Sequence, residues 1–169
     1  IPLMYKEREL KHSQLLCDIR KHLSENEEFQ RQCDKLEDGV YIFGHSHIQW
    51  FIQKGKKIFI NPGSCGLPMD SCERGAPYTL IEADEKGIRI EERRIPYNMD
   101  EFIKKFKESD QYKKVPVWSN IRIRELQARR EHLYFFLKYA EEYAERTGDP
   151  VRPFTRKTWE AAYKEWEKR

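Results

Sequence analysis

The sequence predicts a mixed α/β protein of the α+β class, because helical and strand patterns occupy separate stretches of the chain. Residues 1–36 and 98–169 repeat apolar side chains at a helical period, whereas residues 40–95 contain short apolar or alternating runs separated by turn signals. With 169 residues, the chain can bury roughly two-thirds of its unfolded surface. We expect residues 1–97 to fold as helices followed by strands, and residues 98–169 to form a helical extension packed on them.

Two helices are expected before the first strand. Ser24 is predicted to cap the second helix, because its hydroxyl can accept from N–H groups of the following turn and acidic residues come next. That helix would run to about Leu36, with Phe29 and Cys33 one turn apart. The first helix is predicted from apolar residues at helical spacing, namely Leu10, Leu15, Leu16, Ile19 and Leu23.

Five strands are expected next: Val40–Phe43, Ile48–Gln53, Lys57–Ile60, Pro77–Ala83 and Ile88–Ile95. The first is apolar throughout, which is typical of a central strand covered on both faces. The turn Lys54-Gly55-Lys56 would join the second and third strands into a hairpin, and residues 84–87 would join the last two. Charged residues on both faces of the last strand predict that it is mostly solvated and near an edge.

The C-terminal stretch has a helical pattern with two breaks. Asn98 and Glu101 have the spacing of a capping box at the start of a helix. Residues 113–116 interrupt the pattern, and one long helix is expected from about Asn120 to Arg146. After the stop signal at residues 148–150, a last helix is expected over about residues 155–168.

Composition and charge narrow the classes of protein to consider. Basic and acidic residues number 32 and 29, so the net charge is only +3 and a nucleic-acid partner is not indicated. No apolar run approaches the roughly 20 residues that a membrane span needs. The four cysteines form no C-x-x-C pair, so we expect reduced thiols in a cytoplasmic protein.

The stretch Gly44-His45-Ser46-His47 carries most of the functional information. Gly44 allows the backbone to approach a ligand closely or to adopt positive φ. Imidazole is the commonest metal-binding side chain near neutral pH, so two of them on one short loop would form half of a metal site. An H-x-H pair alone is more often a pair of surface or core histidines, and the sequence context favours the metal site. The other histidines are expected at partly exposed helical positions: His12, His22 and His132.

A glycine-rich turn over residues 61–66 ends the third strand. Its Pro62-Gly63 dipeptide predicts a type II turn. We expect this turn to pack against the histidine loop, so that both line one pocket. Cys65 has no partner base nearby in the sequence, and we interpret it as a small packing residue rather than a nucleophile. The residues expected to line the pocket are Gly44, Asn61, Gly63 and Ser64.

These motifs resemble those of a known family. Residues 40–47, followed by residues 60–70 and 76–78, are similar to the C-terminal half of calcineurin-like metallophosphoesterases, in particular the small bacterial and archaeal phosphodiesterase branch. The similarity extends over about residues 38–97. It implies two packed mixed β-sheets flanked by helices, with residues 1–97 as the C-terminal half of the domain and residues 98–169 as a helical extension.

The resemblance also implies a site with two divalent metal ions, often manganese, iron, zinc or nickel. His45 would bind one metal and His47 the other, each through a ring nitrogen. Metals about 3.5–4 Å apart can hold a bridging hydroxide as the nucleophile and neutralise charge on the phosphoryl oxygens. The implied function is that of a phosphodiesterase or phosphatase, with a small phosphate ester as substrate.

The first half of the family pattern is missing. The family's other ligands come from an Asp-x-His, a Gly-Asp, a Gly-Asn-His and a further histidine, and none of these motifs occurs upstream of the histidine loop. Together with the start at Ile1, this suggests the C-terminal part of a longer enzyme. The strand that carries His45 should then lie at a sheet edge or next to a second chain, with apolar surface exposed.

Two other functions stay open. A relative of the fold that has lost its metals would be a non-catalytic scaffold that binds partner proteins through its sheet edge or its long helices. A mononuclear zinc or nickel module would use His45, His47 and a cysteine such as Cys65 or Cys72. The helices after Tyr97 would cover the pocket entrance or form an oligomer contact, so a homo-oligomer also stays open.

Overall fold

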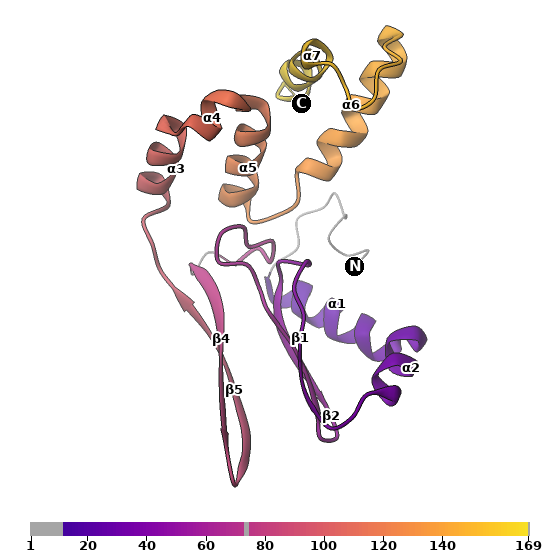
Figure 1. The fold of residues 1–169 in the computed structure, drawn as a ribbon, viewed down its shortest axis with the longest axis vertical. Helices are drawn as coiled ribbons and strands as arrows, with labels where there is room; N and C mark the ends of the chain where they lie inside the picture. Colours follow the sequence, from indigo (N-terminus) through magenta and orange to yellow (C-terminus); the bar gives the residue numbers. More distant parts are fainter. Residues whose placement is uncertain (1–11, 73–74, 169) are drawn as a thin grey trace. The chain divides into compact units, whose positions relative to one another are not determined.

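A computed structural model describes residues 12–72 and 75–168, and of His12 only the helical backbone (Figure 1). The chain divides into two compact units, Ile1–Tyr97 and Asn98–Arg169, and each is considered by itself. In the described residues, all strands belong to the first unit, and the second unit is helical. The α+β class predicted from the sequence is therefore confirmed, while the expected contribution of Leu10 to the first helix lies outside the described residues.

The described residues of the first unit form two sheets. β3 is the middle strand of the larger sheet, with β1 parallel on one side and β2 antiparallel on the other, so this sheet is mixed as expected. β4 and β5 form an antiparallel hairpin. The strand bounds agree with the predictions to within two residues: β1 (Gly39–Ile42), β2 (Gln49–Lys54), β3 (Lys57–Pro62), β4 (Ala76–Asp84) and β5 (Gly87–Ile95).

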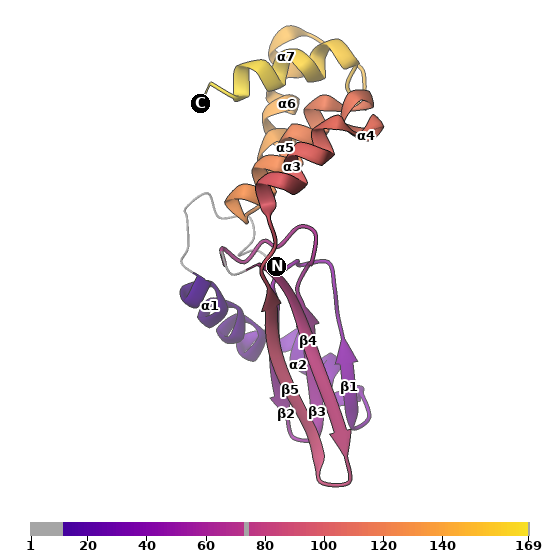
Figure 2. The ribbon, with the colours of Figure 1, turned by 90° about the vertical axis from the view of Figure 1, so that its left-hand side faces the viewer.

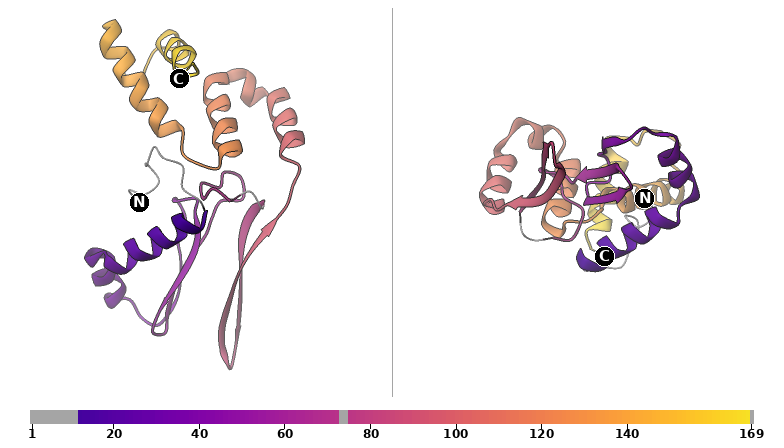
Figure 3. Two further views of the ribbon diagram at one scale, coloured as in Figure 1. Left: turned by 180° about the vertical axis from the view of Figure 1, so that it is seen from behind. Right: turned by 90° about the horizontal axis from the view of Figure 1, so that it is seen from below.

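The three-stranded sheet is the middle layer of this unit. Helices α1 (His12–Glu25) and α2 (Glu27–Lys35) lie on one of its faces and the β4–β5 hairpin on the other (Figures 1, 2 and 3). Where the hairpin begins, the buried Gln49 joins the two sheets, since its Nε2 donates to the carbonyl oxygens of Tyr78 and Arg93 at 2.8 and 3.3 Å. Toward its tip the hairpin diverges from the sheet, and its residues become exposed (Figure 1).

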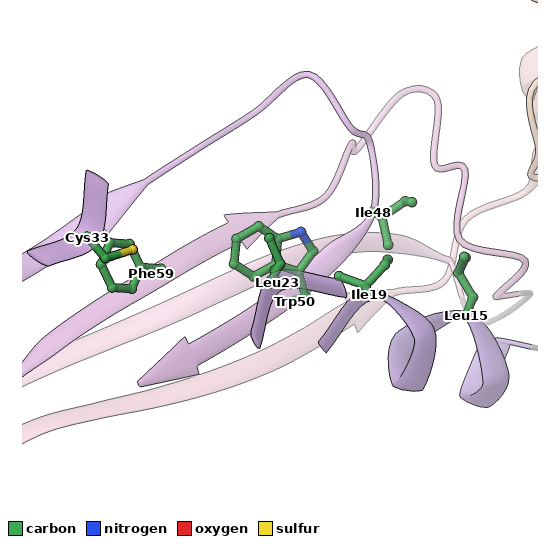
Figure 4. Packing of buried hydrophobic residues seen from close by; sticks show 7 residues of the cluster. All are labelled: Leu15, Ile19, Leu23, Cys33, Ile48, Trp50 and Phe59. Atoms are coloured by element: carbon green, nitrogen blue, oxygen red, sulfur yellow. The ribbon is translucent and has the colours of Figure 1, made fainter. Parts of the chain in front are cut away.

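The core of the first unit lies between α1 and the sheet. Three buried residues at helical spacing, Leu15, Ile19 and Leu23, project from one face of α1, as the sequence predicts. They meet side chains of the sheet and of the segment before β2 (Figure 4). The cluster is completed by Cys33, Ile48, Trp50 and Phe59.

β1 is an edge strand, so the prediction that it is central and covered on both faces is wrong. Tyr41 stacks on Phe59 with ring centroids 5.4 Å apart, but Ile42 is 63% and Phe43 42% exposed. The covered strand is β3, in which Ile58, Phe59 and Ile60 are all buried. An apolar run of four residues does not reveal how many neighbours a strand has, and here no described strand lies on the second side of β1.

The cap between the first two helices is Asn26, not Ser24. Asn26 Oδ1 accepts from the backbone N–H of Phe29 at 2.7 Å, at the start of α2. Ser24 lies inside α1, where its hydroxyl donates to the carbonyl oxygen of Lys21 at 2.8 Å. Both residue types are good caps, and α1 extends two residues further than expected, which leaves Asn26 at the junction.

The described residues of the second unit form five helices. α3 begins at the predicted cap Asn98, and α7 begins at Thr155, a cap that was not predicted. Asn98 Oδ1 accepts from the backbone N–H of Glu101 at 3.0 Å, and Thr155 Oγ1 accepts from that of Thr158 at 3.2 Å. Aromatic side chains surround a core that includes Ile121, Phe136 and Ala162. The helices are α3 (Met99–Glu108), α4 (Asp110–Lys114), α5 (Pro116–Ala128), α6 (Leu133–Thr147) and α7 (Arg156–Trp166).

The single long helix expected over residues 120–146 is two helices. α5 ends at Ala128, and its C-cap residue Arg129 has a φ of 52°, in the left-handed region. The buried Glu125 then satisfies the start of α6, because its Oε1 accepts from the backbone N–H groups of His132 and Leu133 at 2.9 and 2.7 Å. Arg122 neutralises the same carboxylate through a 2.6 Å contact. The carboxylate at the N-terminus of α6 compensates for the helical hydrogen bonds lost at the break.

His132 is partly exposed as predicted, but it lies just outside the helix in which it was expected. It is the N-cap residue of α6, its ring lies edge-on to Trp166 at 6.3 Å, and its Nε2 is buried without a hydrogen-bond partner in the described residues. Burial, reinforced by the positive charges of Arg124 and Arg130, lowers the pKa of His132 to about 4. The ring is therefore neutral at physiological pH.

Replacing Glu125 should destabilise the second unit. We expect Glu125→Ala to lower the free energy of unfolding by about 3 kcal/mol, because two backbone donors and Arg122 lose a buried acceptor. Urea unfolding followed by far-UV circular dichroism measures the change. Glu142→Ala, at an exposed position of α6, should cost less than about 0.5 kcal/mol. Equal losses for the two variants would contradict the assignment of Glu125 as the cap.

The lowered pKa of His132 predicts a pH dependence of stability. Unfolded chains bind a proton at this histidine below its ordinary pKa of 6.5, whereas the folded chain does so only near pH 4. The stabilisation is therefore complete above pH 6.5 and decreases as the pH falls from 6.5 to about 4. As the pH falls from 6.5 to about 4, the wild type should lose unfolding free energy relative to His132→Gln, because glutamine does not titrate. For the exposed Gln127→Ala the difference from wild type should stay constant, and a constant difference for His132→Gln would contradict the prediction.

Candidate functional site

Parallel pairing of β1 and β3 brings two loops to the same edge of the larger sheet. The histidine loop, residues 44–47, follows β1, and the turn over residues 63–67 follows β3. The backbone N–H of Phe43 donates to the carbonyl oxygen of Ile60 at 2.7 Å and extends the pairing to the start of the histidine loop. Because parallel strands end at the same edge, the two loops meet as the sequence predicts.

Asn61 connects the two loops. Its buried amide nitrogen Nδ2 donates to the carbonyl oxygen of Gly44 at 3.0 Å and to Ser46 Oγ at 2.7 Å. Its Oδ1 accepts from the backbone N–H of Gly63 at 3.0 Å. One side chain thus fixes the histidine loop and the turn at once, which is a specific reason for an amide at this position.

The turn after β3 requires glycine at residue 63. Gly63 has a φ of 83°, in agreement with the turn that Pro62-Gly63 predicts. A Cβ added to Gly63 would lie 2.8 Å from Pro77 Cγ and 3.2 Å from Gln49 Cβ, so the turn packs closely on both sheets. Ser64 Oγ accepts from the backbone N–H of Leu67 at 3.0 Å and closes the loop.

The backbone of the histidine loop is strained at both histidines. His45 has a φ of 67° and His47 a φ of 55°, in the left-handed region that residues with a side chain seldom adopt. The N–H of Ser46 donates to the carbonyl oxygen of Gly44 at 2.8 Å, which makes His45 the centre of a γ-turn of the rarer, strained form. His45 is exposed as a consequence, while Ser46 points inward and is buried.

The ring of His47 is held by the other loop. Its Nδ1 lies 2.9 Å from the carbonyl oxygen of Leu67, and the carbonyl oxygen of His47 accepts from the backbone N–H of Met69 at 3.0 Å. A carbonyl oxygen can only accept, so Nδ1 carries the proton and Nε2 of the neutral ring has a free lone pair. Metal-binding histidines have this arrangement, in which one ring nitrogen donates to a carbonyl and the other faces the metal.

A buried ion pair anchors the far end of the turn segment. Arg94 Nη2 contacts Asp70 Oδ2 closely, and the two side chains are only 8% and 0% exposed. Asp70 Oδ1 also accepts from the backbone N–H of Cys72 at 3.3 Å. The pair joins the segment after β3 to β5, so the histidine loop, the turn and both sheets form one connected structure. Sequence reasoning did not single out Asp70.

The two histidines are not part of a larger ligand cluster in the described residues. No three His, Cys, Asp or Glu side chains of residues 13–72 and 75–168 come together as a metal site. All four cysteines are free, as expected, and Cys72 is buried. Cys65 is exposed, so the prediction that it is a small packing residue is wrong. The third ligand of the mononuclear module is therefore absent from this part of the chain.

The structure brings together the six residues that the sequence placed at the site, although the pocket they would line stays a prediction. Gly44, Asn61, Gly63 and Ser64 participate in the contacts between or within the loops, and His45 and His47 lie on the loop that these contacts fix. Sequence reasoning missed Ser46 and the carbonyl oxygen of Leu67. The pairing of Asn61 with a loop hydroxyl could have suggested Ser46, but no sequence signal identifies one backbone carbonyl.

Comparison with known proteins found no protein-family model that matches the chain and no match among curated proteins. Among the described helices, none is both long enough and apolar enough to cross a membrane.

Asn61→Asp should uncouple the two loops. The carboxylate cannot donate to Gly44 and Ser46, and it would place a negative charge beside the Gly44 carbonyl oxygen. We expect a loss of about 2–3 kcal/mol in unfolding free energy, measured by urea titration. The same substitution at the N-cap, Asn98→Asp, should change stability by less than about 0.5 kcal/mol, because aspartate is an equally good cap. Similar values for the two variants would contradict the role of Asn61.

Proposed function

We propose that this chain supplies the two-histidine part of a dinuclear metal site in a phosphoesterase related to the calcineurin-like metallophosphoesterases. The proposed metals are divalent ions such as manganese, iron, zinc or nickel, and the proposed substrate is a small phosphate ester. The observation that carries the proposal is the hydrogen bond between His47 Nδ1 and the Leu67 carbonyl oxygen, at 2.9 Å. It orients the ring and leaves Nε2 available as a ligand.

The strain at the histidines supports the same function. Each left-handed residue costs about 1 kcal/mol or more, and such strain concentrates at functional sites because the surrounding structure must maintain it. In this loop it presents His45 to solvent, and no described residue accepts or donates a hydrogen bond to its ring. A loop serving only to connect β1 with β2 has no physical need for two imidazoles in this conformation.

The donor set fits metals only in part. Two imidazoles are suitable ligands, but two ligands alone do not hold a catalytic pair of ions. The proposal therefore requires further ligands from outside the described residues. Among the described strands β1 has an open edge beside the loop, and its exposed Ile42 is available for packing. We place a strand from outside the described residues along this edge, where it would complete the two-sheet sandwich that the resemblance implies.

Within that site this chain has two tasks. His47 and His45 bind metal through ring nitrogens, and Asn61 keeps the loop that carries them from relaxing. The metals, when bound, supply the Lewis acidity and charge neutralisation that cleavage of a phosphate ester needs.

The second candidate is the non-catalytic scaffold, and the open edge of β1 favours it specifically. A strand with one unpaired edge and exposed apolar side chains can bind a strand of a partner protein without any metal. The two candidates differ in what they require of the histidines, because a scaffold would keep its function when both are replaced.

Metal analysis combined with hydrolysis of bis-p-nitrophenyl phosphate separates the candidates in the complete natural protein. The proposal predicts two divalent metals per chain and turnover. His45→Ala and His47→Ala should each reduce activity roughly 100-fold or more, through loss of a ligand. His22→Ala, a histidine substitution in α1 away from the loop, should retain activity.

Each of the other possible results of this experiment supports an alternative function or contradicts the proposal. Protein without bound metal and without turnover would support the scaffold, and one metal without turnover would support a mononuclear module. Turnover that survives both loop substitutions would contradict the proposal even if metal were present.

A further inference from the structure

The second unit contains a cavity of about 690 Å³, remote in sequence from the histidine loop. Four segments of this unit form it, namely α4 with the start of α5, one position of α6, the segment before α7, and the first turns of α7. Its volume lies within the range of pockets that take small molecules, roughly 300–1,000 Å³.

The walls of the cavity are apolar and aromatic. Trp118 and Trp159 both line it, and Phe154 stacks on Trp159 with ring centroids 6.0 Å apart. Trp159 is in turn held edge-on by the buried Phe136 at 4.7 Å, so this wall is continuous with the core of the unit. Leu137 contributes a 40% exposed side chain. Flat aromatic surfaces of this kind favour a flat apolar ligand.

The polar side chains of the cavity, apart from the two indoles, are Gln111, Lys114, Arg156 and Glu160. Arg156 pairs with Glu160, Nε to Oε1, at 2.7 Å, which leaves little net charge from these two. Lys114 also lines the cavity, and its ammonium has no ion pair or hydrogen bond with any described residue. Neither indole N–H of Trp118 and Trp159 has an acceptor in the part of the chain that the structure describes. The groups without a hydrogen-bond partner among the described residues are thus the Lys114 cation, two neutral indole donors and the amide of Gln111, which can donate or accept. The one unpaired charge of the lining is positive and complements an anion.

We propose that this cavity binds a small amphipathic anion, with a flat aromatic body between the two tryptophans and its negative group at Lys114. The charge complementarity selects an anion over a cation or a neutral ligand. The cavity is concave and belongs to one unit, and the only strongly exposed apolar side chains along it are Val115 and Leu137. That is too little apolar surface for a protein-docking face, so a small molecule is the occupant that the site fits.

The probe is 2-naphthoate, with the neutral 2-naphthamide as its matched analogue. Nuclear magnetic resonance of the four indole N–H groups of the full chain reports binding, because each tryptophan gives one signal. We expect the signals of Trp118 and Trp159 to shift saturably, with a Kd of roughly 20–500 µM for a ligand of this size. The signal of Trp50, buried in the other unit, should not move.

Two substitutions test the two ends of the ligand. Lys114→Met should weaken 2-naphthoate about three- to tenfold and leave 2-naphthamide unchanged. Its control is Lys113→Met, since Lys113 does not line the cavity and faces Asp110 at 3.8 Å. Leu137→Trp should fill the cavity and weaken both probes about tenfold or more, whereas Glu142→Trp, exposed on the same helix, should not.

Several results would overturn the proposal. These are the absence of saturation up to about 5 mM probe, equal losses for the two lysine variants, and unchanged affinity in a folded Leu137→Trp. Concentration-dependent broadening of the Trp118 and Trp159 signals without probe would also overturn it, because it would identify a second copy of the chain as the occupant.

Discussion

The side chain of Asn61 is the interaction on which the histidine loop depends. Its three hydrogen bonds, to Gly44, Ser46 and Gly63, contribute about 1 kcal/mol each, and they act on a loop whose two left-handed histidines cost about the same in total. The parallel pairing of β1 and β3 makes these bonds geometrically available, because both loops leave the sheet at one edge. Without Asn61 the loop could relax to a conformation with negative φ, and the orientation of both imidazoles would change.

The sequence predicted which loops form the site, but not the contacts that orient the histidines within it. The two motifs, Gly-His-Ser-His and Asn-Pro-Gly-Ser, indicate loops at the ends of adjacent strands, and the structure brings them together. What the sequence could not predict is the partner of His47, since any of several backbone carbonyls in the turn was within reach. Nor does the sequence state that His45 would sit at the centre of a γ-turn, because histidine has no strong preference for that position and tertiary contacts impose it.

Two errors in the fold, at β1 and at residues 120–146, share one cause, which is that local patterns do not encode neighbours. Val40–Phe43 is as apolar as a central strand, yet one side of β1 has no strand beside it in the described residues. Residues 120–146 have a continuous helical pattern, yet the buried Glu125 compensates for a break at Arg129 by accepting from the start of α6. In contrast, the hairpins and the cap at Asn98 depend on residues close in sequence, and these were predicted.

The account rests on His47 having its proton on Nδ1 and a free lone pair on Nε2. A long-range ¹H–¹⁵N spectrum of the full chain, recorded above pH 7.5 with and without Zn²⁺, measures this most directly. The account predicts the Nδ1–H tautomer for His47 and a metal-induced shift of its Nε2, accompanied by a shift of the His45 ring. An Nε2–H tautomer at His47, or rings that do not respond to the metal, would contradict it.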